Sequence, residues 1–207
     1  MRLFAAVLPP EDVTSELGSV VEELRGLPGA GALRWTGRPG WHYTLAFYGE
    51  VAEEVLPDLS ARLERAAHRT APFPLAVRGG GQFGKGRALW AGAEGDLPAL
   101  RLLADRAESA ARKAGVEMGE HRRYRAHLTV ARSRDEVEVR PYLDALASFT
   151  SRTWTVRELF LVRSNLPRSG LPGEQPRYET VARWPLGAPA SGASLGAGGC
   201  RSPAAAG

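Results

Sequence analysis

Cysteine, lysine and long apolar runs are all scarce in this chain of 207 residues. The single cysteine, Cys200, lies near the C-terminal end, so the sequence offers neither an intrachain disulfide framework nor a cysteine-based metal site. The longest N-terminal apolar run, Leu3 to Leu8, stops at two prolines and is too short for a secretion signal or a membrane span. We therefore expect a cytoplasmic protein without redox chemistry and without a membrane partner.

Arginine carries almost all of the positive charge. Of the 27 basic residues only Lys85 and Lys113 are lysines, and the formal net charge is +4. Guanidinium groups bind phosphate oxygens in pairs, so this bias suits a phosphate-rich partner. A GC-rich coding sequence would produce the same bias, and charge alone does not define a site.

The apolar pattern alternates strands with amphipathic helices, which is typical of an α+β protein. Asp96 stands where a helix N-cap is expected, and Gly115 stands where that helix ends. The aromatic run 41–48 predicts a central strand. Strands are also expected at 2–9, 73–77, 88–91, 127–131, 154–163 and 178–184, with a glycine turn at 79–81, and helices at 10–25, 53–70, 97–114 and 141–148.

The C-terminal segment differs in composition from the rest of the chain. From Gly187 onward the sequence is rich in glycine, alanine, serine and proline, and Leu195 is its only large apolar residue. Such a segment cannot bury enough apolar surface to offset its ordering entropy. We therefore expect one two-lobed domain over residues 1–186 and a disordered tail over 187–207.

Two of the four histidines begin a His-x-Thr-x tetrapeptide inside a strand-like run. These are His42-Tyr43-Thr44-Leu45 and His127-Leu128-Thr129-Val130. With nine threonines in the chain, two such coincidences have a chance probability of about 1%. Because strand side chains alternate between faces, His42 and Thr44 share one face, and so do His127 and Thr129.

Two imidazoles and two hydroxyls around one small volume suit phosphodiester hydrolysis. A neutral imidazole can take a proton from water while a protonated one donates to the leaving oxygen. The hydroxyls of Thr44 and Thr129 can donate to the non-bridging oxygens. No cluster of carboxylates with metal-ligand spacing accompanies the motifs, so the sequence gives no support for a two-metal mechanism.

Structural, non-catalytic interpretations are also open for the histidines. A lone histidine in an apolar strand is more often a hydrogen-bonded core residue than a catalytic one, although two matching motifs reverse those odds. A metal bound by His42, His127 and His121 would lack a carboxylate or cysteine to complete its ligand set. His68 and His121 are expected to be solvated surface residues.

The paired motifs and their flanks resemble the two-histidine phosphoesterase superfamily, specifically its bacterial and archaeal RNA 2′,3′-cyclic phosphodiesterases, once described as 2′-5′ RNA ligases. The resemblance covers residues 1 to about 186. Beyond the motifs, it includes the stretches RLFAAVLPP, RWTGRPGWHYTLAFYGEV, FGKGRALWAG, HLTVAR with Arg132, LVRSNLPRSG, Tyr178 and RWPL.

This resemblance implies a bilobal α+β fold of two pseudo-symmetric lobes, each with an antiparallel sheet and flanking helices, whose motifs face a central cleft. It also implies hydrolysis of an RNA 2′,3′-cyclic phosphate end to a 2′-phosphomonoester, with no metal and no nucleotide cofactor. We expect the protein to be a monomer. By position, His42 would be the proton donor and His127 the proton acceptor. Ala126 stands where the family commonly has proline, and Tyr43 stands where leucine is common.

The flanking residues suggest contacts to RNA. Arg132 could reach phosphate, but it has the opposite strand parity to His127, so the strand must end or bend after Ala131. Phe47 and Trp90 could stack on a base, or belong to the core. The run from Arg122 to Arg125 could guide the RNA backbone, or be a solvated loop.

Two alternative functions stay open. One is RNA end joining through a 2′-5′ linkage, which uses the same site in reverse. The other is an RNA-binding module whose site is no longer catalytic.

Overall fold

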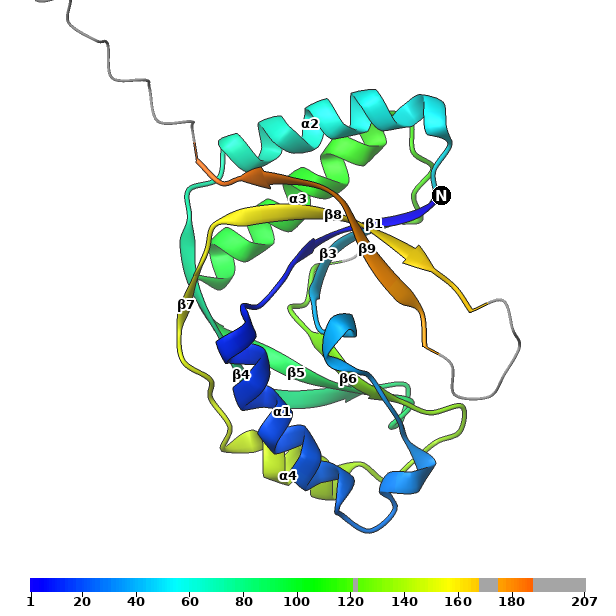
Figure 1. Ribbon diagram of the computed structural model, residues 1–207, viewed down its shortest axis with the longest axis vertical. Coiled ribbons are helices and arrows are strands. Elements are labelled where there is room, and N and C mark those ends of the chain that lie inside the picture. The colour runs from blue at the N-terminus through cyan, green and yellow to red at the C-terminus, as the bar shows by residue number, and fades with distance from the viewer. Residues whose placement is uncertain (121–122, 168–174, 188–207) are drawn as a thin grey trace, which may run out of the picture.

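The computed structural model describes residues 1–120, 123–167 and 175–187, and it has two antiparallel sheets with helices on their outer sides (Figure 1). The first sheet has the order β3-β1-β8-β9, with bounds Tyr43–Glu50, Arg2–Val7, Glu158–Asn165 and Arg177–Pro185. The second sheet has the order β2-β6-β5-β4-β7, with bounds Arg34–Trp35, Leu128–Arg132, Ala88–Gly95, Phe73–Phe83 and Trp154–Val156.

Two helices accompany each sheet, which gives the two lobes. Helices α2 (Leu56–His68) and α3 (Leu97–Lys113) pack on the first sheet, and α1 (Glu11–Arg25) and α4 (Arg140–Ala147) pack on the second. Short 3-10 turns lie at Ala30–Ala32 (η1), Arg38–Gly40 (η2) and Glu53–Val55 (η3). The predicted α+β class with two antiparallel sheets is confirmed.

The chain crosses repeatedly between the lobes. It leaves β1 of the first sheet for α1 and β2 of the second lobe, returns to β3 and α2, and crosses again to β4 and β5. One apolar core therefore extends through both lobes, with Leu3 and Val7 of β1 in the same cluster as Leu75 of β4 and Leu128 of β6. A smaller cluster of Phe4, Ala6 and Val162 lies on the opposite face of the first sheet.

Helix starts follow the sequence signals. The Asp96 carboxylate accepts a hydrogen bond of 2.9 Å from the Ala99 amide, as an N-cap residue does at the start of α3. Helix α2 begins with Pro57 in its first turn, after η3. Proline is tolerated there because the first amides of a helix have no partner within it.

Strand β3 is an edge strand, and the prediction of a central strand at 41–48 is wrong. In the described part of the chain its one strand partner is β1. Its aromatic side chains are buried by other elements: the Tyr48 hydroxyl donates to the Ala107 carbonyl of α3 at 3.2 Å, and the Tyr43 hydroxyl donates to the Gly92 carbonyl of β5 at 2.7 Å. Burial against α3 and against the second sheet thus gives this edge strand the apolar pattern of a central one.

Two further strand boundaries were wrong. Residues 79–81 lie within β4 and not in a turn, and the reversal comes at 84–87, where Gly84, Lys85 and Gly86 have positive φ. The expected strand 154–163 is two strands: β7 pairs with β4 in the second sheet, and β8 pairs with β1 in the first. The chain changes sheets at Arg157.

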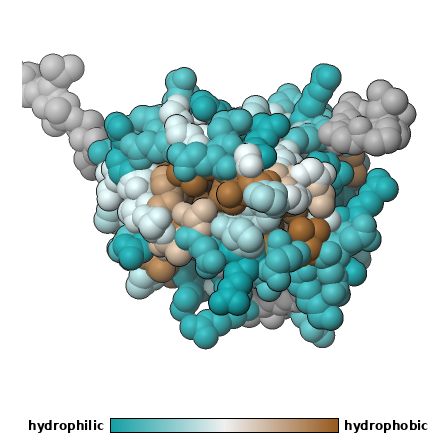
Figure 2. All heavy atoms as spheres, turned by 90° about the horizontal axis from the view of Figure 1, so that it is seen from below, coloured by the Kyte–Doolittle hydropathy of each residue, from teal (hydrophilic) through white to brown (hydrophobic). Residues whose placement is uncertain are grey.

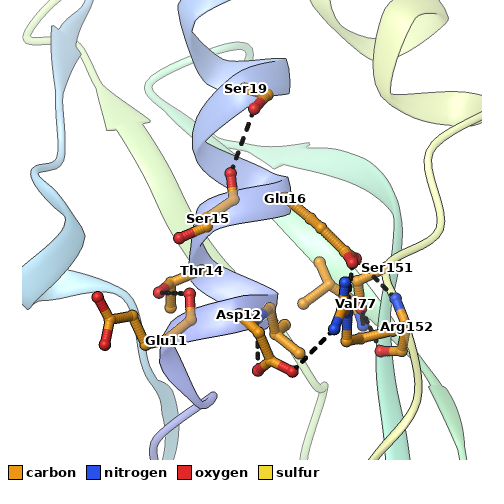
Figure 3. Close-up of polar contacts among 10 residues, drawn as sticks. Glu11, Asp12, Thr14, Ser15, Glu16, Ser19, Val77, Ser151 and Arg152 are labelled. Carbon is orange, nitrogen blue, oxygen red and sulfur yellow. Dashed lines mark hydrogen bonds and ion pairs between the residues drawn. The ribbon is translucent and has the colours of Figure 1, made fainter.

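The first turns of α1 are tied to the loop before β7 (Figure 3). The Arg152 amide donates to the Glu16 carboxylate at 2.7 Å, and its guanidinium contacts Glu16 at 2.5 Å and Asp12 at 3.3 Å. Next to it, the buried Ser151 hydroxyl accepts from the Val77 amide of β4 at 2.9 Å. These contacts fix α1, which follows directly from β1, against the second lobe.

The lower end of the molecule has a mixed surface. Seen from below, hydrophilic residues surround a central band of apolar ones (Figure 2). None of the helices in the described ranges is long and apolar enough to cross a membrane. His121, Arg122 and residues 188–207 of the tail expected over 187–207 lie outside the described residues.

Candidate active site

His42 stands immediately before β3, between aromatic side chains of two other strands. Its ring lies 4.7 Å from the ring of Phe4 on β1 and 5.0 Å from that of Tyr178 on β9, measured between centroids. Thr44 pairs with Ala6 of β1, so it is on the same sheet face as Phe4. The first motif therefore presents its imidazole and hydroxyl on one face, as the alternation predicted.

His127 stands immediately before β6 and has a defined proton position. Its Nδ1 lies 2.8 Å from the Arg125 carbonyl oxygen. A carbonyl only accepts, so Nδ1 carries the proton and the neutral ring keeps Nε2 as a free acceptor. The ring packs edge-on against Phe83 at 5.1 Å and Trp90 at 6.3 Å.

Burial lowers the pKa of both histidines. For His42 burial and the positive charges of His127 and Arg132 lower the pKa to about 4. For His127 burial is again the main cause, the contact with the Arg125 carbonyl opposes it, and the charges of Arg132 and Arg125 add to it. Both imidazoles are thus neutral at pH 7 in the free protein, and the charge of Arg132 acts on each of them.

Arg132 reaches the site because β6 contains a bulge. Along β5, Trp90 pairs with Thr129 but Leu89 pairs with Ala131, so Val130 is the extra residue. The extra residue brings Arg132 to the face of Thr129, with Nη2 3.5 Å from the Thr129 hydroxyl. The expected break comes one residue earlier than Ala131, inside the strand.

Bulges in β3 act in the same way on Phe47. The register shifts twice along the β1–β3 pair, which places Phe47 opposite Phe4, on the face of His42 and Thr44. Phe47 is 48% exposed, and the Arg2 guanidinium lies 4.9 Å from the centroid of its ring. The exposed ring is available for stacking, so the core alternative does not apply to Phe47.

Arg125 and Trp90 belong to the surroundings of His127. The Arg125 guanidinium lies 5.4 Å from the Trp90 ring centroid and 5.7 Å from that of Phe83. Trp90 is half-buried, and its indole N–H has no partner among the described residues. His42 and Thr44 thus share one sheet face, and Thr129 and Arg132 share another. The charge of Arg132 acts on both histidines, and Arg125 lies beside His127.

Tyr43 links the two motifs, which the sequence did not indicate. Its side chain points away from the face of His42, but its hydroxyl bonds to β5, the neighbour of β6. Phe4 and Phe83 form walls of the two histidine pockets, and no local sequence signal indicates this for either residue. Phe4 shares the strand parity of Ala6, but only the pairing of β1 with β3 shows that this face carries a histidine.

The described part of the chain contains no group of three or more histidine, cysteine, aspartate or glutamate side chains that could hold a metal ion. Catalysis without a metal ion is still a prediction, which activity in the presence of EDTA would test.

Comparison with known proteins identifies the family. The sequence model of the 2′-5′ RNA ligase superfamily matches residues 9–168. The chain belongs to this superfamily. A curated RNA 2′,3′-cyclic phosphodiesterase from Thermus thermophilus is 35% identical over 202 residues, which is 90% of each chain.

Other superfamily proteins agree in sequence and in fold. An RNA 2′,3′-cyclic phosphodiesterase from Geobacillus stearothermophilus is 33% identical over 162 residues, 75% of this chain, and the match spans about half (48%) of that protein's length. A crystal structure from Thermus thermophilus superposes with a TM-score of 0.72 at 29% identity, covering 91% of this chain and 99% of the other. The resemblance stated from the motifs is confirmed.

Proposed function

We propose that this chain hydrolyses the 2′,3′-cyclic phosphodiester at RNA ends and leaves a 2′-phosphomonoester. The observation that carries the proposal is that the charge of Arg132 acts on both imidazoles, and that Nε2 of His127 is free to accept a proton. The names of the curated Thermus and Geobacillus relatives support the substrate class.

The roles of proton donor for His42 and proton acceptor for His127 come from the resemblance, and the free Nε2 of His127 fits the acceptor role. His127 Nε2 takes a proton from water as the water oxygen bonds to phosphorus, and the P–O3′ bond breaks as His42 gives its proton to O3′. Arg132 and the hydroxyls of Thr44 and Thr129 stabilise the charge on the non-bridging oxygens. Exchange with solvent then returns each histidine to its starting protonation state.

His42 must be protonated to act as the acid, and the free protein keeps it neutral at pH 7. A bound phosphodiester brings a negative charge next to both imidazoles, which raises their pKa values. Substrate binding therefore increases the fraction of His42 that carries the proton it must donate.

The decisive experiment is product analysis on an oligoribonucleotide with a 2′,3′-cyclic phosphate end, in the presence of EDTA. We expect a 2′-phosphomonoester, identified by its resistance to a 3′-specific phosphatase. His42→Ala and His127→Ala should each lower turnover by about 10³-fold or more while binding is largely kept. Near-normal activity in either variant would rule out the two-histidine mechanism.

Separate tests address the other expectations. Joining of cyclic-phosphate ends to 5′-hydroxyl ends would reveal the reverse reaction, which water at high concentration disfavours. Binding of the RNA without ring opening would indicate a non-catalytic module. One chain carries both motifs, so we propose that the monomer is active, which light scattering on the active chromatography fractions would test. We also propose a cytoplasmic location, which cell fractionation would test.

A further inference from the structure

An arginine-lined groove lies beside His127. It has a volume of about 790 Å³ and is lined by the arginines 78, 101, 123 and 125 together with Trp90 and Tyr124. These arginines come from three places: β4, α3 and the segment that leads into β6. Segments far apart in the sequence thus contribute the same kind of side chain to one hollow.

The charge of the lining is of one sign. Among the residues that the structure describes, no aspartate or glutamate lines the groove, although Arg78 pairs with Glu94 at 3.0 Å from outside it. Arg101 and Arg123 are exposed. Walls that carry one sign of charge concentrate ligands of the opposite sign, and guanidinium forks match phosphate oxygens.

The groove is continuous with the surroundings of His127. Trp90 and Arg125 line the groove, and both also belong to the group of side chains around that histidine. A ligand in the groove would therefore extend from a phosphate held at the two imidazoles. Pockets of ~300–1,000 Å³ hold drug-sized ligands, so this groove has room for more than a single phosphate.

We propose that the groove binds the sugar-phosphate backbone of the nucleotides that precede the cyclic phosphate, with Trp90 as a stacking surface at the entrance to the site. This inference rests on the proposed function and adds a preference for oligonucleotides over mononucleotides. Single-stranded RNA is bound in this way, by a basic groove that follows the backbone and by aromatic side chains under the bases.

The test compares a 2′,3′-cyclic mononucleotide with a hexanucleotide that has the same terminal base and the same cyclic end. The readout is the ratio of kcat/KM for the hexanucleotide to kcat/KM for the mononucleotide. The variants are Arg101→Ala, Arg123→Ala and the double variant. Arg65→Ala is the matched control, since Arg65 is also an exposed helical arginine but lies on α2, outside the groove.

We expect a ratio well above one for the unmodified protein, and a fall of about tenfold in the double variant but not in the control. The salt dependence should change in parallel: for the hexanucleotide, each lost phosphate contact makes the negative slope of log(kcat/KM) against log[salt] shallower by about 0.7. The mononucleotide, which does not extend into the groove, should show no such change in slope.

Two results would overturn the groove proposal and leave the proposed function intact: a ratio near one in the unmodified protein, or equal losses on both substrates in the double variant. If the unmodified protein opens neither substrate, the proposed function fails, and the groove proposal fails with it.

Discussion

Arg132 and Thr129 lie three residues apart on β6 and yet share one face of the strand, with the guanidinium Nη2 3.5 Å from the threonine hydroxyl. Regular alternation would place them on opposite faces. The bulge at Val130 removes this conflict and brings a permanent positive charge to a motif that otherwise has only neutral groups. The same charge lowers the pKa of both histidines.

Replacing Arg132 should therefore change both the rate and the pH profile. Loss of a charged donor to the non-bridging oxygens in Arg132→Ala should lower kcat/KM by about 10²–10³-fold. Because the charge of Arg132 lowers both histidine pKa values, its removal should move both limbs of the pH–rate profile to higher pH. Arg132→Lys keeps the charge, so its limbs should stay close to those of the unmodified protein.

Arg134→Ala is a suitable control for Arg132, because Arg134 is an exposed arginine on the same segment. It should leave the profile in place. Limbs that do not move in Arg132→Ala would show that this charge does not reach the imidazoles.

The ionisation of His42 should depend on the ligand. In the free protein we expect it to titrate near its lowered pKa of about 4. A bound 2′-phosphomonoester product should raise that pKa by one unit or more, since its negative charge stabilises the imidazolium. Nitrogen-15 NMR titration of the imidazole with and without product measures both values, and equal values would contradict the proposed charging of the acid.

The lowered pKa of His42 should also appear in the stability of the protein. The unfolded chain binds a proton near pH 6.5 and the folded one only near pH 4, so stability is full above pH 6.5 and falls as the pH drops toward 4. The loss amounts to about 3 kcal/mol. Urea unfolding of the unmodified protein and of His42→Gln should diverge over this range, and parallel curves would exclude the effect.

The Trp90 indole lies so close to the backbone of Gly81 that no side chain fits at that position. A Cβ atom at Gly81 would lie 2.1 Å from Cζ2 of Trp90, so Gly81→Ala must displace the indole. We expect a loss of about 1–3 kcal/mol in the free energy of unfolding. Because Trp90 packs on His127, kcat/KM should fall by about ten- to a hundredfold.

Gly119→Ala provides the control for Gly81, since nothing lies within 4 Å of a Cβ atom there. It should leave stability and activity unchanged. An unchanged Gly81→Ala variant would mean that the indole has room to move.

Ser151 should matter for stability and not for chemistry. Its buried hydroxyl is the partner of the Val77 amide, so Ser151→Ala leaves that donor unpaired at a cost of about 1–3 kcal/mol. Turnover well below the melting temperature should not change. The exposed Ser148 gives the comparison Ser148→Ala, and equal unfolding midpoints for the two variants would show that the Ser151 hydrogen bond contributes nothing.

Several elements could be predicted because their signals are local. The start of α3 at Asp96 depends on one capping side chain. The position of His42 and Thr44 on one face depends only on the two-residue period of a strand. The edge position of β3, the change of sheet at Arg157 and the extension of β4 through Gly81 depend on which segments pair. That information is spread over the whole chain.

The family could be predicted because each motif lies within four consecutive residues and can be read directly from the sequence. The roles of Arg132, Phe47 and Arg125 could not be decided in that way. The first two reach the face of the histidines through bulges, and the third acts on His127 through its backbone carbonyl, which any residue type would supply.

For the two His-x-Thr-x motifs, the sequence alone determined that each imidazole shares a face with a hydroxyl, since this follows from the pleat of a single strand. Only the tertiary structure decided that the two motifs share one electrostatic environment, that Arg132 joins them, and that His127 keeps Nε2 free. These features require the pairing of β6 with β5, the bond from Tyr43 to Gly92 and burial from both lobes, none of which is contained in a local pattern.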